Sequence, residues 1–297
     1  MDSVMKILIV VLFFCVAVVT AQDKPSSITV KISKVAGNVY FLECVGGFGG
    51  GNVAAWIGDD GILLVDDMYA AMKPQIEAAL KTISDKPVRI VLNSHFHGDH
   101  IQGNKNFGRS SVIIAHENVR KRLIANNKES APILDMLPAV TYNDRINVNF
   151  NGEEIRVTHF PNSHTDSDSV VYFATSNVLH LGDMFFFEMF PAVYAEGGGN
   201  IRQLVVSLEK IIADSPADVK VVPGHGRLAT MQDLKNYVAM LKDTIAIVDA
   251  KIRGGKTLDQ MKTEKVLAKY DALGSGGAQT TDQYLAMLFK LLSADKK

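Results

Sequence analysis

This chain of 297 residues has few cysteines and tryptophans, and neither positive nor negative charge predominates. It has two cysteines and one tryptophan, and its 31 lysines and arginines nearly balance its 32 aspartates and glutamates. Without a basic excess, a nucleic-acid partner is not expected. No block of like charges marks an interaction tail. Hydrophobic residues at 47% and charged residues at 21% are typical of a globular protein with a sizeable core.

The shortage of cysteine excludes a fold held by internal disulfides. Cys15 lies inside an apolar N-terminal run, and removal of that run leaves Cys44 alone. A single cysteine cannot form an internal disulfide even in an oxidising compartment. Cys44 follows the apolar run 39–42, so we expect a buried, inert thiol there.

The N-terminus predicts export. Lys6 precedes an unbroken apolar run over residues 7–19, which is too short to span a bilayer comfortably. Small residues follow, so we predict that residues 1–21 form a signal peptide cleaved between Ala21 and Gln22. The mature chain is then periplasmic or secreted, with no membrane attachment. An uncleaved membrane anchor is the alternative.

Strand and helix patterns alternate along the rest of the chain. Short apolar runs predict strands, and apolar residues at helical spacing predict helices. The expected strands are 38–44, 54–57, 62–65, 88–93, 112–115, 154–159, 170–174, 178–181 and 219–222, and the expected helices are 70–83, 98–107, 117–126, 203–214, 231–252, 258–269 and 281–292. Two strand-rich halves with interleaved helices predict an α/β fold with sheets packed on each other and helices outside. We expect a catalytic domain over 22–226 and a helical C-terminal extension of it over 227–297.

Three of the eight histidines fall within residues 94–100, SHFHGDH. This segment follows a predicted buried strand and precedes a predicted helix. His95 and His97 alternate on an extended backbone, so both rings can point to one side, whereas Asp99 and His100 can face a second point nearby. Their nitrogen and oxygen donors suit zinc. A purely structural role would leave several polar groups at one buried edge, which is unfavourable.

Three further residues occupy similar positions after predicted strands. His164 follows the strand ending at 159, Asp183 follows the strand ending at 181, and His225 follows the strand ending at 222. A layered fold gathers one site from the ends of several strands in this way. Each signal is weak alone, but their joint order predicts a metal centre.

The series His-x-His-x-Asp-His, a lone His, Gly-Asp and Gly-His resembles the metallo-β-lactamase superfamily. The resemblance runs from about residue 38 to 226, and the segment 64–66, Leu-Val-Asp, is similar to the first motif of that family. It implies a four-layer αββα sandwich and two Zn²⁺ ions roughly 3.5–4 Å apart; iron or manganese are alternative metals. It also implies two sets of ligands that share Asp183: His95, His97 and His164 for the first ion, and Asp99, His100 and His225 for the second.

Other residues are expected to support these ligands. By the resemblance, Asp66 orients the metal-binding loop rather than binding metal. His180 is close enough in sequence to Asp183 to be a candidate for a similar role. His116 and His159 are interpreted as structural.

The resemblance implies a hydrolase. Zinc lowers the pKa of bound water to roughly 7, so a metal-bound hydroxide can attack a carbonyl at neutral pH. Asp99 and Asp183 are the candidate catalytic residues that move the proton. The charges of two zinc ions exceed those of two aspartates and one hydroxide, so anionic intermediates and carboxylate-bearing substrates are favoured.

Aromatic residues are expected to shape the substrate pocket. Phe48 lies at the centre of a glycine run over 46–51, which is interpreted either as a flap or as a plain hairpin loop. Phe185 and Phe186 follow Asp183 directly, and their density predicts an apolar wall. Tyr194 is the remnant of a Lys-x-Tyr pair that binds glutathione in glyoxalase II.

The substrate is expected to be a small molecule, and ester, thioester, lactone and β-lactam all stay open. Asp183 stands where the common zinc β-lactamases have a cysteine, and it is similar to glyoxalase II. No lysine follows it closely to hold a drug carboxylate. One lactamase subclass nevertheless uses the same Asp-His-His second set. The alternatives are a class B β-lactamase proper, a mononuclear iron oxidoreductase similar to persulfide dioxygenase, and a non-catalytic zinc-binding protein. The sequence favours no oligomeric state.

Overall fold

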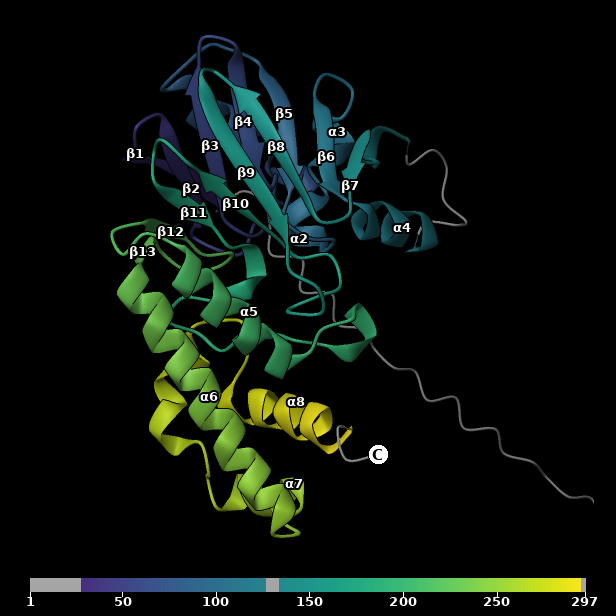
Figure 1. The fold of residues 1–297 in the computed structure, drawn as a ribbon, viewed down its shortest axis with the longest axis vertical. Helices are drawn as coiled ribbons and strands as arrows, with labels where there is room; N and C mark the ends of the chain where they lie inside the picture. The colour runs from purple at the N-terminus through teal and green to yellow at the C-terminus, as the bar shows by residue number, and fades with distance from the viewer. Residues whose placement is uncertain (1–27, 127–133, 295–297) are drawn as a thin grey trace, which may run out of the picture.

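Two β-sheets stacked on each other form the centre of the molecule (Figure 1). The computed structural model describes residues 28–126 and 134–294, so the predicted signal peptide lies outside the described residues. The larger sheet has seven strands in sequence order: β1 (Thr29–Ala36), β2 (Val39–Val45), β3 (Val53–Gly58), β4 (Gly61–Val65), β5 (Val88–Asn93), β6 (Val112–His116) and β7 (Val140–Tyr142). The first four run antiparallel, and β4 to β7 run parallel.

The second sheet has six strands, and its order is β13 (Ala229–Thr230), β12 (Lys220–Val222), β11 (Val178–His180), β10 (Ser169–Phe173), β9 (Glu153–His159) and β8 (Arg145–Phe150). Strands β8 to β11 are antiparallel, whereas β11 and β12 are parallel. As a result, β11 and β12 end at the same edge of the sheet, and the loops that follow them meet there.

Alternation along the strands divides the apolar side chains between two cores. In β3, Ala54 and Trp56 face the second sheet, whereas Val53 and Ala55 face the helix α1 (Lys73–Lys81). Every residue of β4 is buried, because that strand is covered on both faces. This pattern places a dry layer between the sheets and a second layer under α1.

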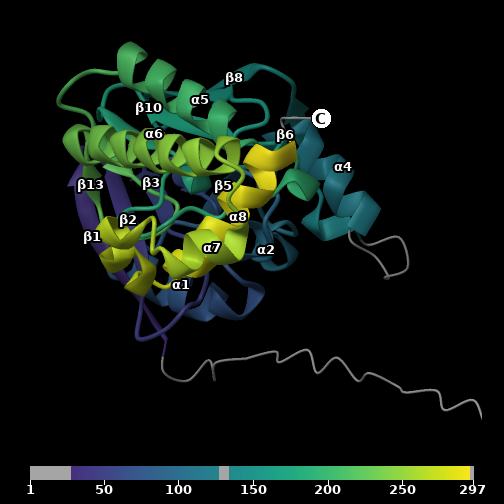
Figure 2. The same ribbon diagram turned by 90° about the horizontal axis from the view of Figure 1, so that it is seen from below.

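The outer face of the second sheet is covered by C-terminal helices (Figure 2). Side chains of β10, β11 and β12 share one core with α5 (Ile201–Asp214), α6 (Met231–Arg253) and α8 (Thr281–Ala294). Helix α6 begins with a capping box between Thr230 and Asp233. The arrangement is therefore helix, sheet, sheet and helix, which confirms the predicted αββα sandwich with a helical C-terminal region.

Several elements differ from their predicted bounds. The helix expected over 98–107 is divided into α2 (Gly98–Ile101) and α3 (Asn104–Phe107), and the buried side-chain amide of Asn104 pairs with that of Asn93 at the end of β5. The helix expected over 258–269 ends early as α7 (Leu258–Thr263), and a 3₁₀ segment, η6 (Ala268–Ser275), follows it. The helix α4 (Glu117–Asn126) lies where it was predicted.

In the part of the chain that the structure describes, no helix is long and apolar enough to cross a membrane.

Candidate metal centre

The seven predicted ligands meet at one edge of the sandwich. His95 and His97 follow β5, and Asp99 and His100 lie in α2. His164 lies in the loop after β9, Asp183 in a 3₁₀ turn after β11, and His225 in the loop after β12. Each ligand is therefore held next to the end of a strand or in a short helix, which gives the site a rigid base.

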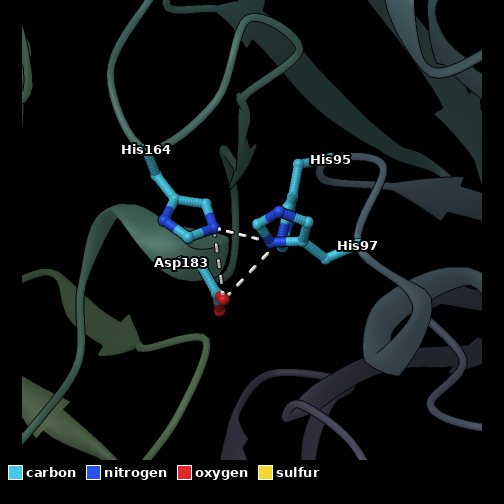
Figure 3. Close-up of side chains that lie close together, drawn as sticks. All are labelled: His95, His97, His164 and Asp183. Atoms are coloured by element: carbon cyan, nitrogen blue, oxygen red, sulfur yellow. Dashed lines mark hydrogen bonds and ion pairs between the residues drawn. The ribbon is translucent and has the colours of Figure 1, made fainter. Parts of the chain in front are cut away.

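Three histidines surround one oxygen of Asp183 (Figure 3). His97 Nδ1 lies 2.9 Å from His164 Nε2, and Asp183 Oδ2 lies 3.4 Å from His164 Nε2 and 3.6 Å from His95 Nε2. The four ligand atoms all lie within 4.8 Å of one another. We call His95, His97 and His164 the three-histidine set.

The other oxygen of Asp183 faces a different group. Asp183 Oδ1 lies 3.0 Å from His100 Nε2 and 3.3 Å from His225 Nε2. Asp99 Oδ2 lies 3.2 Å from the same His225 nitrogen. We call Asp99, His100 and His225 the mixed set. One carboxylate thus presents one oxygen to each set.

The donor atoms are better suited to binding a metal ion than to forming hydrogen bonds with one another. His95 Nε2 is buried and has no hydrogen-bond partner, although buried polar atoms are almost always paired. Imidazole nitrogens and carboxylate oxygens in groups of four are the donors that zinc takes in proteins. The described residues therefore form two groups that could each hold a metal ion, and Asp183 belongs to both.

Burial keeps the three-histidine set neutral. It lowers the pKa of His164 to about 3 and that of His95 well below its usual value, and the neighbouring imidazoles act in the same direction. Burial also lowers the pKa of His97. A histidine must be neutral to bind metal, so these three rings are in the binding form at neutral pH.

In the mixed set the pKa values of the histidines are raised rather than lowered. Burial opposes a charge on His100 and His225, but the carboxylates, Asp183 foremost, outweigh it. They raise the pKa of His225 to about 9 and that of His100 well above its usual value. Burial likewise works against the charge of Asp99 and Asp183, yet His100 holds the pKa of both carboxyls below the usual range.

Asp66 lies where the resemblance placed it, behind the ligands. Its buried carboxylate accepts hydrogen bonds from the backbone N–H and the hydroxyl of Ser94, each at 2.7 Å, and contacts His100 Nδ1 at 2.7 Å. The Ser94 hydroxyl also reaches His95 Nδ1 at 3.0 Å. Asp66 and Ser94 therefore orient one histidine of each set, with Nε2 toward the centre.

His180 lies under the turn that bears Asp183. Its Nδ1 accepts the N–H of Gly182 at 3.2 Å, and its Nε2 lies 3.4 Å from the carbonyl oxygen of Asn52. It contacts the backbone of the turn rather than the ligand carboxylate. His116 and His159, which were interpreted as structural, stack on each other with ring centroids 3.7 Å apart and lie outside both ligand sets.

Two supporting residues were missed by the sequence argument. The amide of Asn52 donates to the carbonyl oxygens of Pro223 and Gly226, at 2.9 and 2.7 Å, and so fixes the loop that bears His225. Asp168 accepts the backbone N–H and the hydroxyl of Thr165 and fixes the loop that bears His164. Burial raises the pKa of Asp168 to about 8.

Close packing leaves no space for side chains around the mixed set. A Cβ at Gly51 would lie 2.0 Å from His100 Cε1, and a Cβ at Gly224 would lie 2.1 Å from Asp183 Oδ1. Glycine is therefore required at both positions. The glycine run 46–51 thus ends against the metal centre, which the composition of the run alone did not indicate.

The ligands open into a cavity of about 720 Å³, the metal cavity. Phe48 is 52% exposed and stacks on the His225 ring at 5.4 Å, and Phe186 stacks on the same ring at 5.1 Å. Tyr194 also lines the cavity. These three aromatic residues lie where the sequence predicted a pocket wall.

The prediction that Phe185 lines the substrate pocket is wrong. It does not line the metal cavity but is fully buried, and its ring packs against Phe187 and Tyr237 in the core under α6. The segment is extended and pairs with the chain at His225, so neighbouring side chains point to opposite faces. Since Phe186 faces the cavity, Phe185 faces the core.

Comparisons with known proteins concern the family and the fold of this chain. The family model described as the metallo-beta-lactamase superfamily matches residues 46–225. A linear primary-alkylsulfatase from Pseudomonas sp. (strain ATCC 19151) is 25% identical over 257 residues, which cover 70% of this chain and 48% of that enzyme. This chain therefore spans about half of the length of the alkylsulfatase.

Two lactamases are also similar. A metallo-beta-lactamase type 2 from Bacteroides fragilis is 22% identical, over 74% of this chain and 88% of its own length. The solved structure of a metallo-beta-lactamase from Pontibacter korlensis superposes with a TM-score of 0.60 at 18% identity, over 72% of this chain and 99% of that one. The likeness to the solved structure concerns the fold alone.

Proposed function

This chain belongs to the metallo-β-lactamase superfamily, and from that premise we propose that it is a zinc-dependent hydrolase with two metal ions. One observation carries the proposal: Asp183 turns one carboxylate oxygen to the three-histidine set and the other to the mixed set. A carboxylate in this position could contribute a ligand oxygen to an ion in each set. A non-catalytic zinc site would need neither a second set nor a cavity above it.

Zinc bound by these residues would supply a Lewis acid and water of lowered pKa, near about 7. The chain supplies the orientation. Asp66 and Ser94 hold His100 and His95, and Asn52 holds the loop of His225. Both amide hydrogens of Asn52 are used in this way, so Asn52 positions the loop rather than binding substrate.

Asp99 is the carboxylate best placed to hold a proton during turnover. Its side chain is 16% exposed toward the metal cavity, whereas that of Asp183 is 5% exposed. Since the pKa of Asp99 is lowered, its carboxylate is charged at neutral pH and can accept a proton. Asp183 is occupied on both sides by ligand histidines, so we assign it to holding the two sets together.

The charge of the site favours anionic substrates. Two zinc ions would outweigh the two carboxylates among the ligands. Arg227 also lines the cavity, but its Nε and Nη2 donate to Glu188, at 3.0 and 2.6 Å, so its charge is already balanced by that carboxylate. The metal centre, rather than a dedicated lysine or arginine, is therefore expected to attract a substrate carboxylate or sulfate.

The substrate class that we propose is a carbonyl compound, namely an ester, thioester, lactone or β-lactam. The residues directly after Asp183 are Met184, Phe185 and Phe186, all buried and apolar, so no cation lies there to hold a drug carboxylate. This feature disfavours a specialised β-lactamase. A sulfate ester is the second candidate, because the relative with the higher identity is an alkylsulfatase.

The test uses the zinc-loaded chain and four substrates: 4-nitrophenyl acetate, an acyl thioester, a chromogenic cephalosporin and an alkyl sulfate. We expect chelator-sensitive turnover of the ester or thioester, two zinc ions per chain, and loss of turnover in Asp99→Ala. The exposed Asp85→Ala is the matched control and keeps full activity. A single iron per chain would favour an oxygenase, and unchanged activity in Asp99→Ala would contradict the proposed site.

A further inference from the structure

A second cavity adjoins the metal cavity. It has a volume of about 380 Å³ and shares two lining residues, Tyr194 and Ala278, with the metal cavity. It extends from these residues between the segment 193–196 and the helix α8. The two cavities therefore lie next to each other at Tyr194 and Ala278, and we call the second one the tail cavity.

One face of α8 forms a wall of the tail cavity. Its lining residues fall at positions i, i+3, i+4, i+7 and i+8, which is a single helical stripe. They are Gln283, Ala286, Met287, Lys290 and Leu291. The middle of the stripe is apolar, and polar groups stand only at its ends.

The opposite wall has the same character. Val193 and Ala195 line it, and Glu196 stands at the rim, where it pairs with Lys290 of α8. The charges at the rim thus neutralise each other and lie in solvent. Small side chains at Ala195, Ala278 and Ala286 leave the space between the walls open. The cavity suits an uncharged, apolar chain rather than a charged group.

The wall is fixed to the segment that follows the metal ligand Asp183. Phe190 stacks on Tyr284 of α8 with centroids 4.2 Å apart, and the amide of Gln279 donates to the carbonyl oxygen of Pro191. The Tyr284 hydroxyl is in turn bonded to Thr244 of α6 at 2.9 Å. The tail cavity is therefore preformed, so little conformational entropy of its wall is lost when a ligand binds.

We propose that the tail cavity binds the apolar acyl or alkyl chain of a substrate whose scissile group lies at the metal centre. This inference rests on the proposed hydrolase function. The helix α8 lies beyond residues 46–225, which match the family, so the family as a whole does not account for this wall. The preferred substrate would be an ester with a flexible apolar chain and with its polar group at one end.

Binding tests the tail cavity separately from catalysis. Acetate and decanoate carry the same carboxylate and differ only in the chain, so their affinities for the zinc-loaded chain are compared by titration calorimetry. A buried methylene contributes up to about fourfold in affinity, so we expect decanoate to bind at least about 10²-fold more tightly than acetate. Equal affinities would overturn the proposal, whether or not any ester is hydrolysed.

A substitution on α8 locates the effect. Ala286→Trp fills the tail cavity, and we expect it to remove most of the advantage of decanoate while the affinity for acetate stays the same. Ala294→Trp introduces the same side chain at an exposed position of the same helix and is the control. Ala286→Leu is a milder variant for use if the tryptophan lowers the melting temperature. Decanoate binding that is unchanged in both Ala286 variants would place the chain elsewhere and overturn the proposal.

Kinetics add a second readout. For 4-nitrophenyl acetate, butyrate and octanoate, kcat/KM should rise with chain length in the unmodified chain and in Ala294→Trp, but not in Ala286→Trp. If neither the unmodified chain nor any variant hydrolyses 4-nitrophenyl acetate, the result counts against the proposed hydrolase. If 4-nitrophenyl acetate is hydrolysed but kcat/KM does not rise toward the octanoate, the result counts against the tail cavity alone.

Discussion

The two ligand sets lie side by side and share Asp183, yet they differ in charge and in proton binding. The three-histidine set groups with one carboxylate, that of Asp183, and burial keeps its rings neutral, with a pKa of about 3 for His164. The mixed set has two carboxylates, which raise the pKa of His225 to about 9. The same residue types therefore form one site that is ready for metal and another that must first lose protons.

In the proposed two-metal centre, this difference would give the two ions different roles. An ion in the three-histidine set would meet neutral nitrogens, and Ser94 supports one of these rings, that of His95. An ion in the mixed set would have to displace protons from His100 and His225, and it would offset the charge of Asp99. We therefore expect the first ion to be the more permanent and the second to respond to pH and to substrate.

We expect the largest loss of activity from substitution of Asp183, which belongs to both sets. Asp183→Asn keeps the size of the side chain but replaces one shared oxygen by an amide nitrogen, which cannot bind a metal ion. We expect kcat/KM to fall on the order of 10³-fold, at least as much as the loss of one oxyanion donor in other hydrolases, and the metal content to fall below two per chain. Metal analysis and ester hydrolysis measure both, with Asp85→Asn as control. Retention of both ions and of activity would show that Asp183 is not shared.

Metal retention as a function of pH sharpens the comparison. A histidine with a raised pKa holds its proton as the pH falls below that value, so metal affinity at the mixed set decreases as the pH drops below about 9. The three-histidine set keeps its affinity to lower pH, because its pKa values are lowered. Dialysis at stepped pH, followed by metal analysis, should show loss of one ion before the other. Simultaneous loss of both would contradict the difference between the sets.

A supporting residue of only one set tests whether the sets can be weakened separately. Asn52→Ala removes the two hydrogen bonds that fix the loop of His225 and leaves the three-histidine set untouched. Loss of such a partner typically costs about 10- to 100-fold in metal affinity. Competition with a zinc-binding dye should show a weaker second equivalent and an unchanged first one. An equal loss in both equivalents would mean that Asn52 supports the whole edge of the sandwich.

We expect the smallest loss of activity from substitution of Phe48 in the glycine run 46–51. Phe48 stacks on His225, a mixed-set residue, and meets Tyr69 edge to face, and neither of these ring contacts involves the three-histidine set. Phe48→Ala should lower kcat/KM by about two- to tenfold, the range of a single aromatic pair, mainly through a higher KM. Zinc content should stay the same. A change in zinc content would instead make Phe48 part of the support of the metal ligands.

The fold and the ligands were predictable from the sequence for different reasons. Central strands such as β4 and β5 are covered by other layers, so they appear as apolar runs. The ligands follow such strands in short motifs. The missed strands β1, β7, β8 and β13 are the four edge strands of the two sheets, where one side is unpaired and the apolar pattern is diluted.

The supporting contacts and the pocket were less predictable. Asn52 lies 171 residues from Pro223, whose carbonyl oxygen it binds, and no local pattern indicates such a contact. Phe185 and Phe186 are chemically identical neighbours, and only the direction of the extended segment decides which of them faces the cavity. The tail cavity depends on how α8 packs against the segment after Asp183, which periodicity does not show.

Anomalous diffraction from crystals of the zinc-loaded chain, measured on either side of the zinc absorption edge, tests the central claim most directly. The account predicts two anomalous peaks, one among His95, His97 and His164 and one among Asp99, His100 and His225, with the Asp183 carboxylate between them. A single peak, or a second peak away from the mixed set, would contradict a two-metal centre that is bridged by Asp183.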